Sequence, residues 1–294
     1  MAEKARDISR RIRSVQATKK ITNAMQLIAA SRIIRAQART ERSRPYARAV
    51  SEMIRMLSSE ARQNPLLAEH EEVRTVGIVV VTSDRGLAGA YNANVLREAQ
   101  RAIARERAAG HEVQIVSVGR KGQAFFRFRR IPMAETIMGV TDTPTYADAK
   151  RIADFVSRAY VAGEIDRVLV AYTDFVSAAL QRARVAQLLP AISPEEDRER
   201  EGEARAIFEY EPEPELMLGA LLPRYLEMRI YAALLESSTS EHAARMRAMK
   251  SATDKAEDLI KLFKIRANKA RQQEITSELA DIVGATEALK TSAL

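Results

Sequence analysis

The chain has 294 residues, of which 46% are apolar and 29% charged, as in folded proteins of one or two domains. It has no cysteine, which excludes disulfides and fits a reducing compartment. No apolar run approaches the ~18 residues that span a membrane, and the first residues lack a signal-peptide core. The net charge of +8 is uneven, because residues 1–44 hold +9 and the remainder −1. This basic segment predicts an anionic partner: nucleic acid, lipid or an acidic protein surface.

Residues 3–60 are predicted to form one long helix, since the first proline is Pro45 and the first glycine Gly77. An apolar stripe follows it at helical spacing. The stripe consists of Ile8, Ile12, Val15, Ile21, Met25 and Ile28. Small residues lie near the stripe, namely Ala24, Ala29, Ala30 and Ala36. They favour close approach of a second helix.

The middle of the chain, residues 70–205, has the pattern of an α/β domain. Residues 75–82 form a β-branched run typical of a strand buried on both faces. Further strands are predicted at 111–119, 166–175 and 180–190. The intervening helices are predicted at 92–109, from Lys121 to before Pro132, and at 145–162 with Thr145 as the cap and Gly163 as the stop. This alternation predicts a small Rossmann-like domain with a mainly parallel sheet.

The C-terminal part is predicted to be a second, longer helix over residues 216–289. After Pro223 there is neither glycine nor proline until Gly284. The acidic, proline-containing residues 195–215 before it are expected to be an exposed connection. An apolar seam follows heptad spacing along the helix. Its residues are Met249, Ala252, Ala256, Leu259, Phe263, Ala267 and Ala270, with Leu279, Ile282 and Leu289 further on.

Two long helices at opposite ends of one chain, each with an apolar seam, predict an intramolecular antiparallel coiled coil. Antiparallel pairing follows if the α/β domain joins the end of one helix to the start of the other. The predicted domains are therefore an N-terminal coiled-coil helix (1–60), a central α/β domain (70–205) and a C-terminal coiled-coil helix (208–294). Two independent amphipathic helices on one core remain the alternative.

No pattern of catalytic or metal-binding residues is found. The turn Gly86–Ala90 lacks the complete glycine motif of a dinucleotide site, and no phosphate-binding loop occurs. In this turn Asp84 and Arg85 are expected to set the local geometry and Gly86 to supply a permissive backbone. The chain is accordingly predicted to have no catalytic residue, no cofactor and no metal.

The three histidines are far apart and without ligand spacing. His70, His111 and His242 are therefore expected to be ordinary surface or partly buried residues. Arg271, Gln272 and Gln273 interrupt the apolar seam, either as an exposed face or as a polar contact ring for a partner.

Three stretches resemble the gamma subunit of F-type ATP synthases, the rotor shaft. They are IRSVQATKKITNAMQLIAASRIIRAQ (12–37), TSDRGLAGAYN (82–92), and SEHAARMRAMKSATDKAEDLI with NKARQQEITSELADIVGATEAL (240–260 and 268–289). Shorter likenesses occur at 119–126, 187–190 and 210–215, so the resemblance extends over nearly the whole chain in the family's order.

The resemblance implies a non-catalytic central-stalk subunit that couples ion-driven rotation of the c-ring to conformational cycling of catalytic sites on the beta subunits. Its partners would be the hexamer of alpha and beta subunits, the epsilon subunit and the c-ring, with one copy per complex. It would lie at the cytoplasmic face of the bacterial cell membrane as a peripheral protein. No nucleic acid is implied.

Motif matches carry some of the family's residues over. Contacts to alpha and beta are implied for Met25, Arg85, Arg245, Arg271, Gln272, Thr276 and Glu278. Tyr210 and Glu211 resemble foot residues near the c-ring. The sequence departs from the family at Asn23, where many members have lysine, and in the loop GLAGAYN, where many members have a cysteine and a second glycine.

Two other hypotheses stand beside the shaft. A basic coiled-coil protein that binds nucleic acid would use the +9 segment, although this segment has no interleaved aromatics and no recognised module. A small nucleotide-binding enzyme with helical arms is disfavoured by the incomplete glycine motif.

Overall fold

The computed structural model describes residues 5–57, 64–68, 70, 72–191 and 213–292. It divides into two compact units. The α/β unit comprises residues 29–245, and the helix-pair unit comprises residues 1–28 with 246–294. Two long helices, α1 (Ala5–Leu57) and α6 (Pro214–Ser292), contribute to both units. None of the helices in the described residues is long and apolar enough to cross a membrane.

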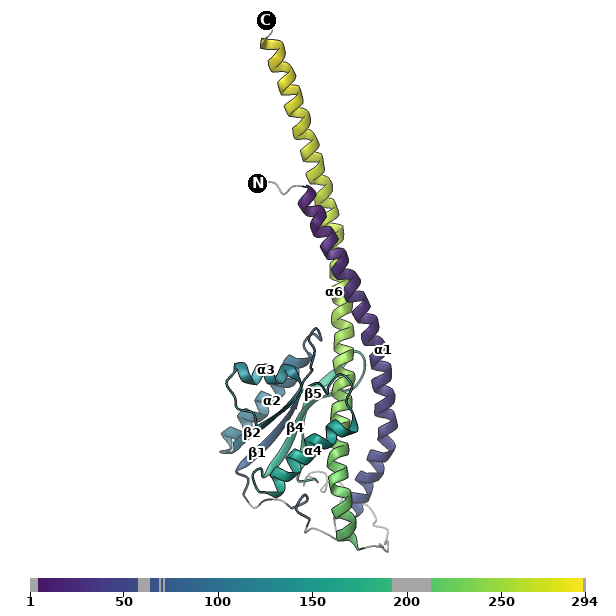
Figure 1. Cartoon of the computed structure of the whole chain (residues 1–294), viewed down its shortest axis with the longest axis vertical. Helices are drawn as coiled ribbons and strands as arrows, with labels where there is room; N and C mark the ends of the chain where they lie inside the picture. Colours follow the sequence, from purple (N-terminus) through teal and green to yellow (C-terminus); the bar gives the residue numbers. More distant parts are fainter. Residues whose placement is uncertain (1–4, 58–63, 69, 71, 192–212, 293–294) are drawn as a thin grey trace. The chain divides into compact units, whose positions relative to one another are not determined.

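A five-stranded mixed sheet forms the centre of the α/β unit, in the order β3-β2-β1-β4-β5 (Figure 1). The strands are β1 (Thr75–Val81), β2 (Glu112–Val118), β3 (Glu135–Ile137), β4 (Arg167–Phe175) and β5 (Gln181–Leu189). The first four are mutually parallel, and β5 pairs antiparallel with β4. The four predicted strands and the mainly parallel sheet are confirmed. The edge strand β3 was not predicted, because three residues are too few to show a pattern.

The two faces of the sheet are covered by different helices (Figure 1). On one face α2 (Tyr91–Ala108) and α3 (Arg120–Phe128) pack over Val76, Ile78 and Val80. On the other, α4 (Tyr146–Val161) packs with α1 and α6 over Val79 and Val81. Side chains of β1 alternate between the two cores because a strand has a period of two residues. Burial on both faces explains why β1 consists of β-branched residues apart from Gly77.

The predicted start and end of α4 are both confirmed. The Thr145 hydroxyl accepts a hydrogen bond from the Asp148 backbone N–H, and the Asp148 carboxylate accepts one from Thr145 N. These reciprocal bonds form a capping box. Gly163 follows the last turn with a φ of 72°, the left-handed conformation that ends many helices.

In the helix-pair unit, residues of α1 and α6 are joined by two polar contacts. Thr22 and Thr253 hydroxyls lie 2.7 Å apart, and Lys19 Nζ lies 3.1 Å from Glu257 Oε2. Since the partner number falls as the α1 number rises, the two segments run antiparallel here.

The buried stripe differs in detail from the predicted one. Ile8 and Met249 are buried as predicted, but Ile21 and Ile28 are 61% and 54% exposed, and Thr22 takes a buried position instead. On α6, Leu259 is 43% exposed whereas Ile260 is 9% exposed. Adjacent residues differ by about 100° around a helix, so an apolar neighbour on the wrong side is easily mistaken for a seam position.

Candidate functional site

The loop that follows β1 is held by the carboxylate of Asp84. Its Oδ1 accepts hydrogen bonds from the backbone N–H groups of Arg120 (3.1 Å) and Gly139 (2.9 Å). Its Oδ2 accepts from the N–H (3.0 Å) and hydroxyl (2.9 Å) of Thr141. Burial by itself would raise the pKa of Asp84, but these bonds outweigh it and hold the pKa below its ordinary value. The prediction that Asp84 sets the local geometry is confirmed.

The backbone of this loop corrects the role predicted for Gly86. The left-handed residues are Leu87, with a φ of 62°, and Gly89, with a φ of 56°. A leucine in this conformation costs more than a glycine would, and the surrounding contacts hold it there. Nearby, Gly119 has a φ of 93°, and a Cβ there would lie 2.2 Å from the Thr82 carbonyl oxygen. Gly119, between β2 and α3, therefore cannot be replaced by a residue with a side chain unless the backbone shifts.

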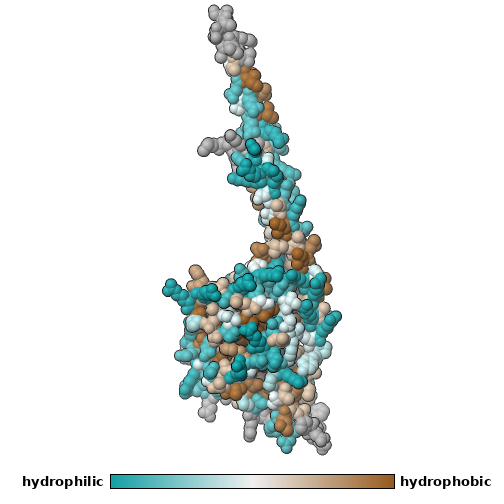
Figure 2. Space-filling model, viewed as in Figure 1, coloured by the Kyte–Doolittle hydropathy of each residue, from teal (hydrophilic) through white to brown (hydrophobic). Residues whose placement is uncertain are grey.

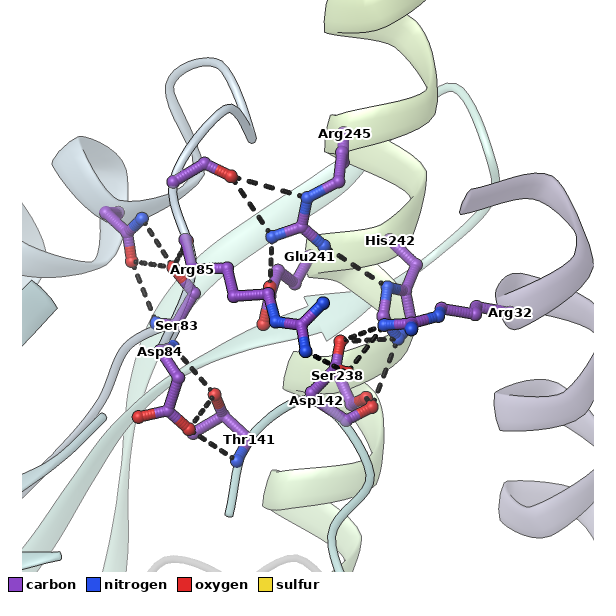
Figure 3. A network of polar contacts seen from close by, with 12 residues as sticks. Arg32, Ser83, Asp84, Arg85, Thr141, Asp142, Ser238, Glu241, His242 and Arg245 are labelled. Atoms are coloured by element: carbon purple, nitrogen blue, oxygen red, sulfur yellow. Dashed lines mark hydrogen bonds and ion pairs between the residues drawn. The ribbon is translucent and has the colours of Figure 1, made fainter. Parts of the chain in front are cut away.

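Asp142 is where the loops of the sheet meet both long helices (Figure 3). Arg32 of α1 places Nη1 2.5 Å from the Asp142 carboxylate, and Arg85 of the β1 loop approaches it to 3.8 Å. From α6, His242 Nε2 lies 3.2 Å from the Asp142 carbonyl oxygen, and the Ser238 hydroxyl donates to the same oxygen over 3.3 Å. One residue thus joins α1, α6 and the β1 loop.

A second connection runs from Arg245 of α6 to the loop (Figure 3). Its Nε and Nη2 donate to the Gly86 carbonyl oxygen over 3.3 and 3.2 Å. The same guanidinium forms an ion pair with Glu241 and lies 3.3 Å from His242 Nδ1. An arginine can only donate, so His242 Nδ1 is an acceptor and its proton is on Nε2. His242 is therefore neutral and donates to Asp142.

Burial governs the protonation of this network. It lowers the pKa of His242 to about 4, with the charges of Arg245 and Arg32 adding to the effect of desolvation. It raises the pKa of Glu241 to about 7, against the opposing attraction of Arg245. His242 and Glu241 are 2% and 1% exposed. The expectation that His242 is a surface or partly buried residue was wrong.

The polar groups of the network are engaged with one another. Within the described ranges, no group of three or more His, Asp or Glu residues is arranged to hold a metal ion. The groups bind one another, and the hydrogen-bonded Arg32–Asp142 pair is of a kind that contributes about 1–3 kcal/mol. The result is a fixed connection between the sheet and two helices.

The structure brings together two pairs of the predicted contact residues: Arg85 with Arg245 in the network, and Gln272 with Thr276 on α6, where the Thr276 hydroxyl donates to the Gln272 carbonyl oxygen over 2.8 Å. Arg85, with a side chain 66% exposed, and Arg245, 6% exposed, both belong to the network. Met25 is half-buried in the helix-pair unit. Four others are exposed on α6, namely Arg271, Gln272, Thr276 and Glu278. Tyr210 and Glu211 lie outside the described residues.

Sequence reasoning missed Asp142, His242 and Arg32. The available signal was the polar run ESSTSEH at 236–242 inside a long helix, where seven consecutive residues hold no aliphatic side chain. Ser237, Thr239 and Ser240 are each at most 1% exposed, so this turn is enclosed on all sides. A polar run in a helix that otherwise has an apolar seam indicates buried hydrogen bonding.

Comparisons with known proteins decide the family. A family model described as ATP synthase matches residues 4–289. A relative from Parafrankia sp., named ATP synthase gamma chain, is 46% identical over 298 residues and covers 100% of both chains. One of the same name from Frankia casuarinae is 47% identical and covers 98% of this chain and 99% of its own.

The chain belongs to the gamma chain family of ATP synthases.

Solved chains from two ATP synthases have a similar fold. A chain from the central stalk and c-ring of the Tetrahymena thermophila mitochondrial ATP synthase matches with a TM-score of 0.61 and 29% identity, over 79% of this gamma chain and 99% of its own length. A chain from the rotor of the Euglena gracilis enzyme matches with a TM-score of 0.64 and 18% identity, over 92% and 98%. At 18% identity, the match to the Euglena gracilis chain shows a shared fold. The resemblance drawn from the sequence is confirmed, and no finding supports the nucleic-acid alternative.

Proposed function

We propose that this gamma chain is the rotary shaft of its ATP synthase, coupling ion-driven rotation of the c-ring to conformational cycling of catalytic sites on the beta subunits. The chain supplies no catalytic group of its own. α1 and α6 form an antiparallel coiled coil, and the Rossmann-like α/β domain is inserted between them. The functional division remains 1–60, 70–205 and 208–294.

The observation that carries the proposal is that two loops of the sheet, the β1 loop and the loop between β3 and α4, are bound to the long helices. Arg32 on α1 and His242 on α6 both bind Asp142, while Arg245 on α6 binds Gly86. A torque applied to the sheet is passed to both helices through these bonds and the packed core. α6 is bound at two separate loop residues, Asp142 and Gly86, and α1 is bound at Asp142.

The predicted partners follow from the same proposal. One copy stands within the hexamer of alpha and beta subunits, with the epsilon subunit and the c-ring at its foot, on the cytoplasmic face of the bacterial membrane. Met25, Arg271, Gln272, Thr276 and Glu278 contact alpha and beta directly, as does Arg85. Arg245 acts by holding the loop, because its guanidinium is already engaged. Tyr210 and Glu211 are assigned to the foot.

Weak contacts suit a shaft that must turn. Exposed ion pairs contribute about 0–1 kcal/mol each, so a basic helix facing acidic loops is attracted without being locked at one angle. Apolar side chains gather along the C-terminal part of α6 (Figure 2), where Ile275, Leu279, Ile282 and Val283 are 50–64% exposed. We assign this tip to an apolar collar of the hexamer.

Reconstitution with purified alpha and beta subunits tests the proposal. The full chain should assemble one copy to six subunits and restore ATP hydrolysis, and a bead fixed to the α/β unit should rotate as ATP is consumed. A chain that fails to join the hexamer, or that binds DNA with a steep salt dependence instead, contradicts the proposal.

A further inference from the structure

The outer layer formed by α2 and α3 carries a second concentration of positive charge. Residues 91–131 hold nine Lys and Arg residues against three Glu residues. One of those acids, Glu106, is buried and forms an ion pair with Arg167 of β4. Hydrophilic side chains cover much of the α/β unit in the view of Figure 2. Outside residues 1–44 the net charge is only −1, because acidic residues elsewhere in the chain offset this local excess of positive charge.

An exposed aromatic ring stands among these charges at the end of α3. Phe128 is 86% exposed, the highest value among the large hydrophobic residues of the described chain. Its neighbour Phe126 is fully buried and Phe125 is half-buried against the same core. The helix is thus already anchored, and Phe128 adds nothing to the packing of the α/β unit.

The backbone beside Phe128 is strained. Arg130 has a φ of 56° just beyond the helix, a conformation that glycine adopts most readily. An arginine there costs stability relative to glycine. The position retains a long cationic side chain where folding alone favours a residue with no side chain.

The cations around Phe128 have no acidic partner in the part of the chain that the structure describes. Arg129 lies over the Phe125 ring at 5.5 Å. Among the described residues, Arg127 and Arg130 form no ion pair, whereas Arg101 on α2 pairs with Glu98 at 2.7 Å. We call Phe128 with Arg127, Arg129 and Arg130 the α3 patch.

We propose that the α3 patch docks a carboxylate-rich surface of another protein, with Phe128 inserted into an apolar recess and the arginines paired with the surrounding carboxylates. Protein interfaces concentrate their binding energy in one aromatic or arginine anchor that a polar rim encloses. The unpaired arginines require acidic groups on the partner, because charge complementarity selects and orients it.

Other anionic partners fit the patch less well. A membrane-binding helix presents several apolar side chains along one face, but α3 buries Phe126 and exposes one ring. Single-stranded nucleic acid stacks successive bases on successive aromatics, and the patch offers one. The α3 patch lies on the sheet face opposite to the one packed on α1 and α6. The docking proposal therefore uses none of the contacts to the long helices on which the proposed shaft function rests.

Photo-cross-linking in the complete, purified ATP synthase containing this chain tests the proposal. Phe128 is replaced by p-benzoylphenylalanine, and adducts are located by mass spectrometry. The matched control carries the same probe at Val161, which is 59% exposed at the end of α4 on the other sheet face. We expect an adduct to an Asp- and Glu-rich segment of another polypeptide, several-fold above the control and declining as salt rises to about 0.5 M.

Other outcomes overturn the proposal. They are an adduct to lipid, to nucleic acid or to an acid-poor segment, a yield equal to the control, a yield that salt does not change, and no adduct.

Arg130→Gly separates docking from folding. Glycine relieves the left-handed backbone, so the melting temperature of the full chain should not fall. In a chain that also carries the probe at position 128, the cross-link should drop several-fold, because one cation is lost. An unchanged yield in this variant contradicts the role of Arg130 in the patch.

Discussion

At the scale of single residues, His242 shows how position decides the chemistry of a side chain. The same imidazole on the surface would titrate near its ordinary pKa of 6.5. Here burial lowers the pKa to about 4, while Arg245 and the Asp142 carbonyl oxygen fix the tautomer. The neutral ring serves as a donor and acceptor that joins two polar groups. Its pKa makes this role testable.

His242 should make the stability of the α/β unit fall in mild acid. Between pH 6.5 and about 4 the unfolded chain binds a proton at His242 that the folded chain does not, so the free energy of unfolding declines as the pH falls. The total loss is up to about 3 kcal/mol. His242→Gln, which keeps an amide donor and acceptor, should lack this loss. Urea unfolding at several pH values measures both.

Glu241 provides the internal control for this comparison. Its raised pKa of about 7 acts with the opposite sign, because the folded chain holds a proton that the unfolded chain releases between pH 4.5 and 7. The unmodified chain and the His242→Gln variant both contain Glu241, so its effect cancels in the difference between their free energies of unfolding. A difference between the two free energies that stays constant from pH 4 to 7 would contradict the assignment of His242.

At the scale of elements, the helical seam of α6 shows the limit of periodicity. Periodicity identified most of the stripe, but it could not choose between Leu259 and Ile260, which are both apolar and adjacent. Packing in the folded chain makes that choice, and Ile260 is the buried one of the two. Thr22 and Thr253 likewise enter the stripe through a hydrogen bond that apolar spacing does not reveal.

Ile260→Ala should weaken the helix pair more than Leu259→Ala. Removing a buried isoleucine side chain costs about 2 kcal/mol or more, whereas truncating the exposed leucine should cost less than about 0.5 kcal/mol in the isolated chain. Amide hydrogen exchange around Thr22 on α1 reports the opening of the pair. Equal protection in the two variants would show that Ile260 does not lie at the contact.

At the scale of the whole molecule, the proposed shaft divides its tasks along the chain. The α/β unit joins both helices through a polar network, and α6 continues to a tip with exposed apolar side chains. Such side chains stabilise an assembly only when a partner covers them. The proposed function therefore predicts that truncating the C-terminal part of α6 affects assembly and not the connection of the α/β unit to the helices.

Ending the chain before Ile275 should leave rotation intact and weaken assembly. The removed tip takes away four large exposed apolar residues, and a loss of only about 1.4 kcal/mol lowers the assembly constant tenfold. Dissociation of the complex on dilution measures the effect. A chain ending at Lys290 is the control, since it keeps those four residues. Undiminished stability of the shorter complex would remove the basis for an apolar bearing.

Local sequence patterns were enough to predict the two long helices, the four main strands, the cap at Thr145 and the family. These features follow from local periodicity, turn residues and motif order, all of which are written in consecutive residues. The contacts of Asp142 with Arg32, Arg85 and His242 could not be predicted, because those residues are far apart in the chain and meet only in the folded protein. Their pKa values and partners depend on burial, which arises only when separate elements pack.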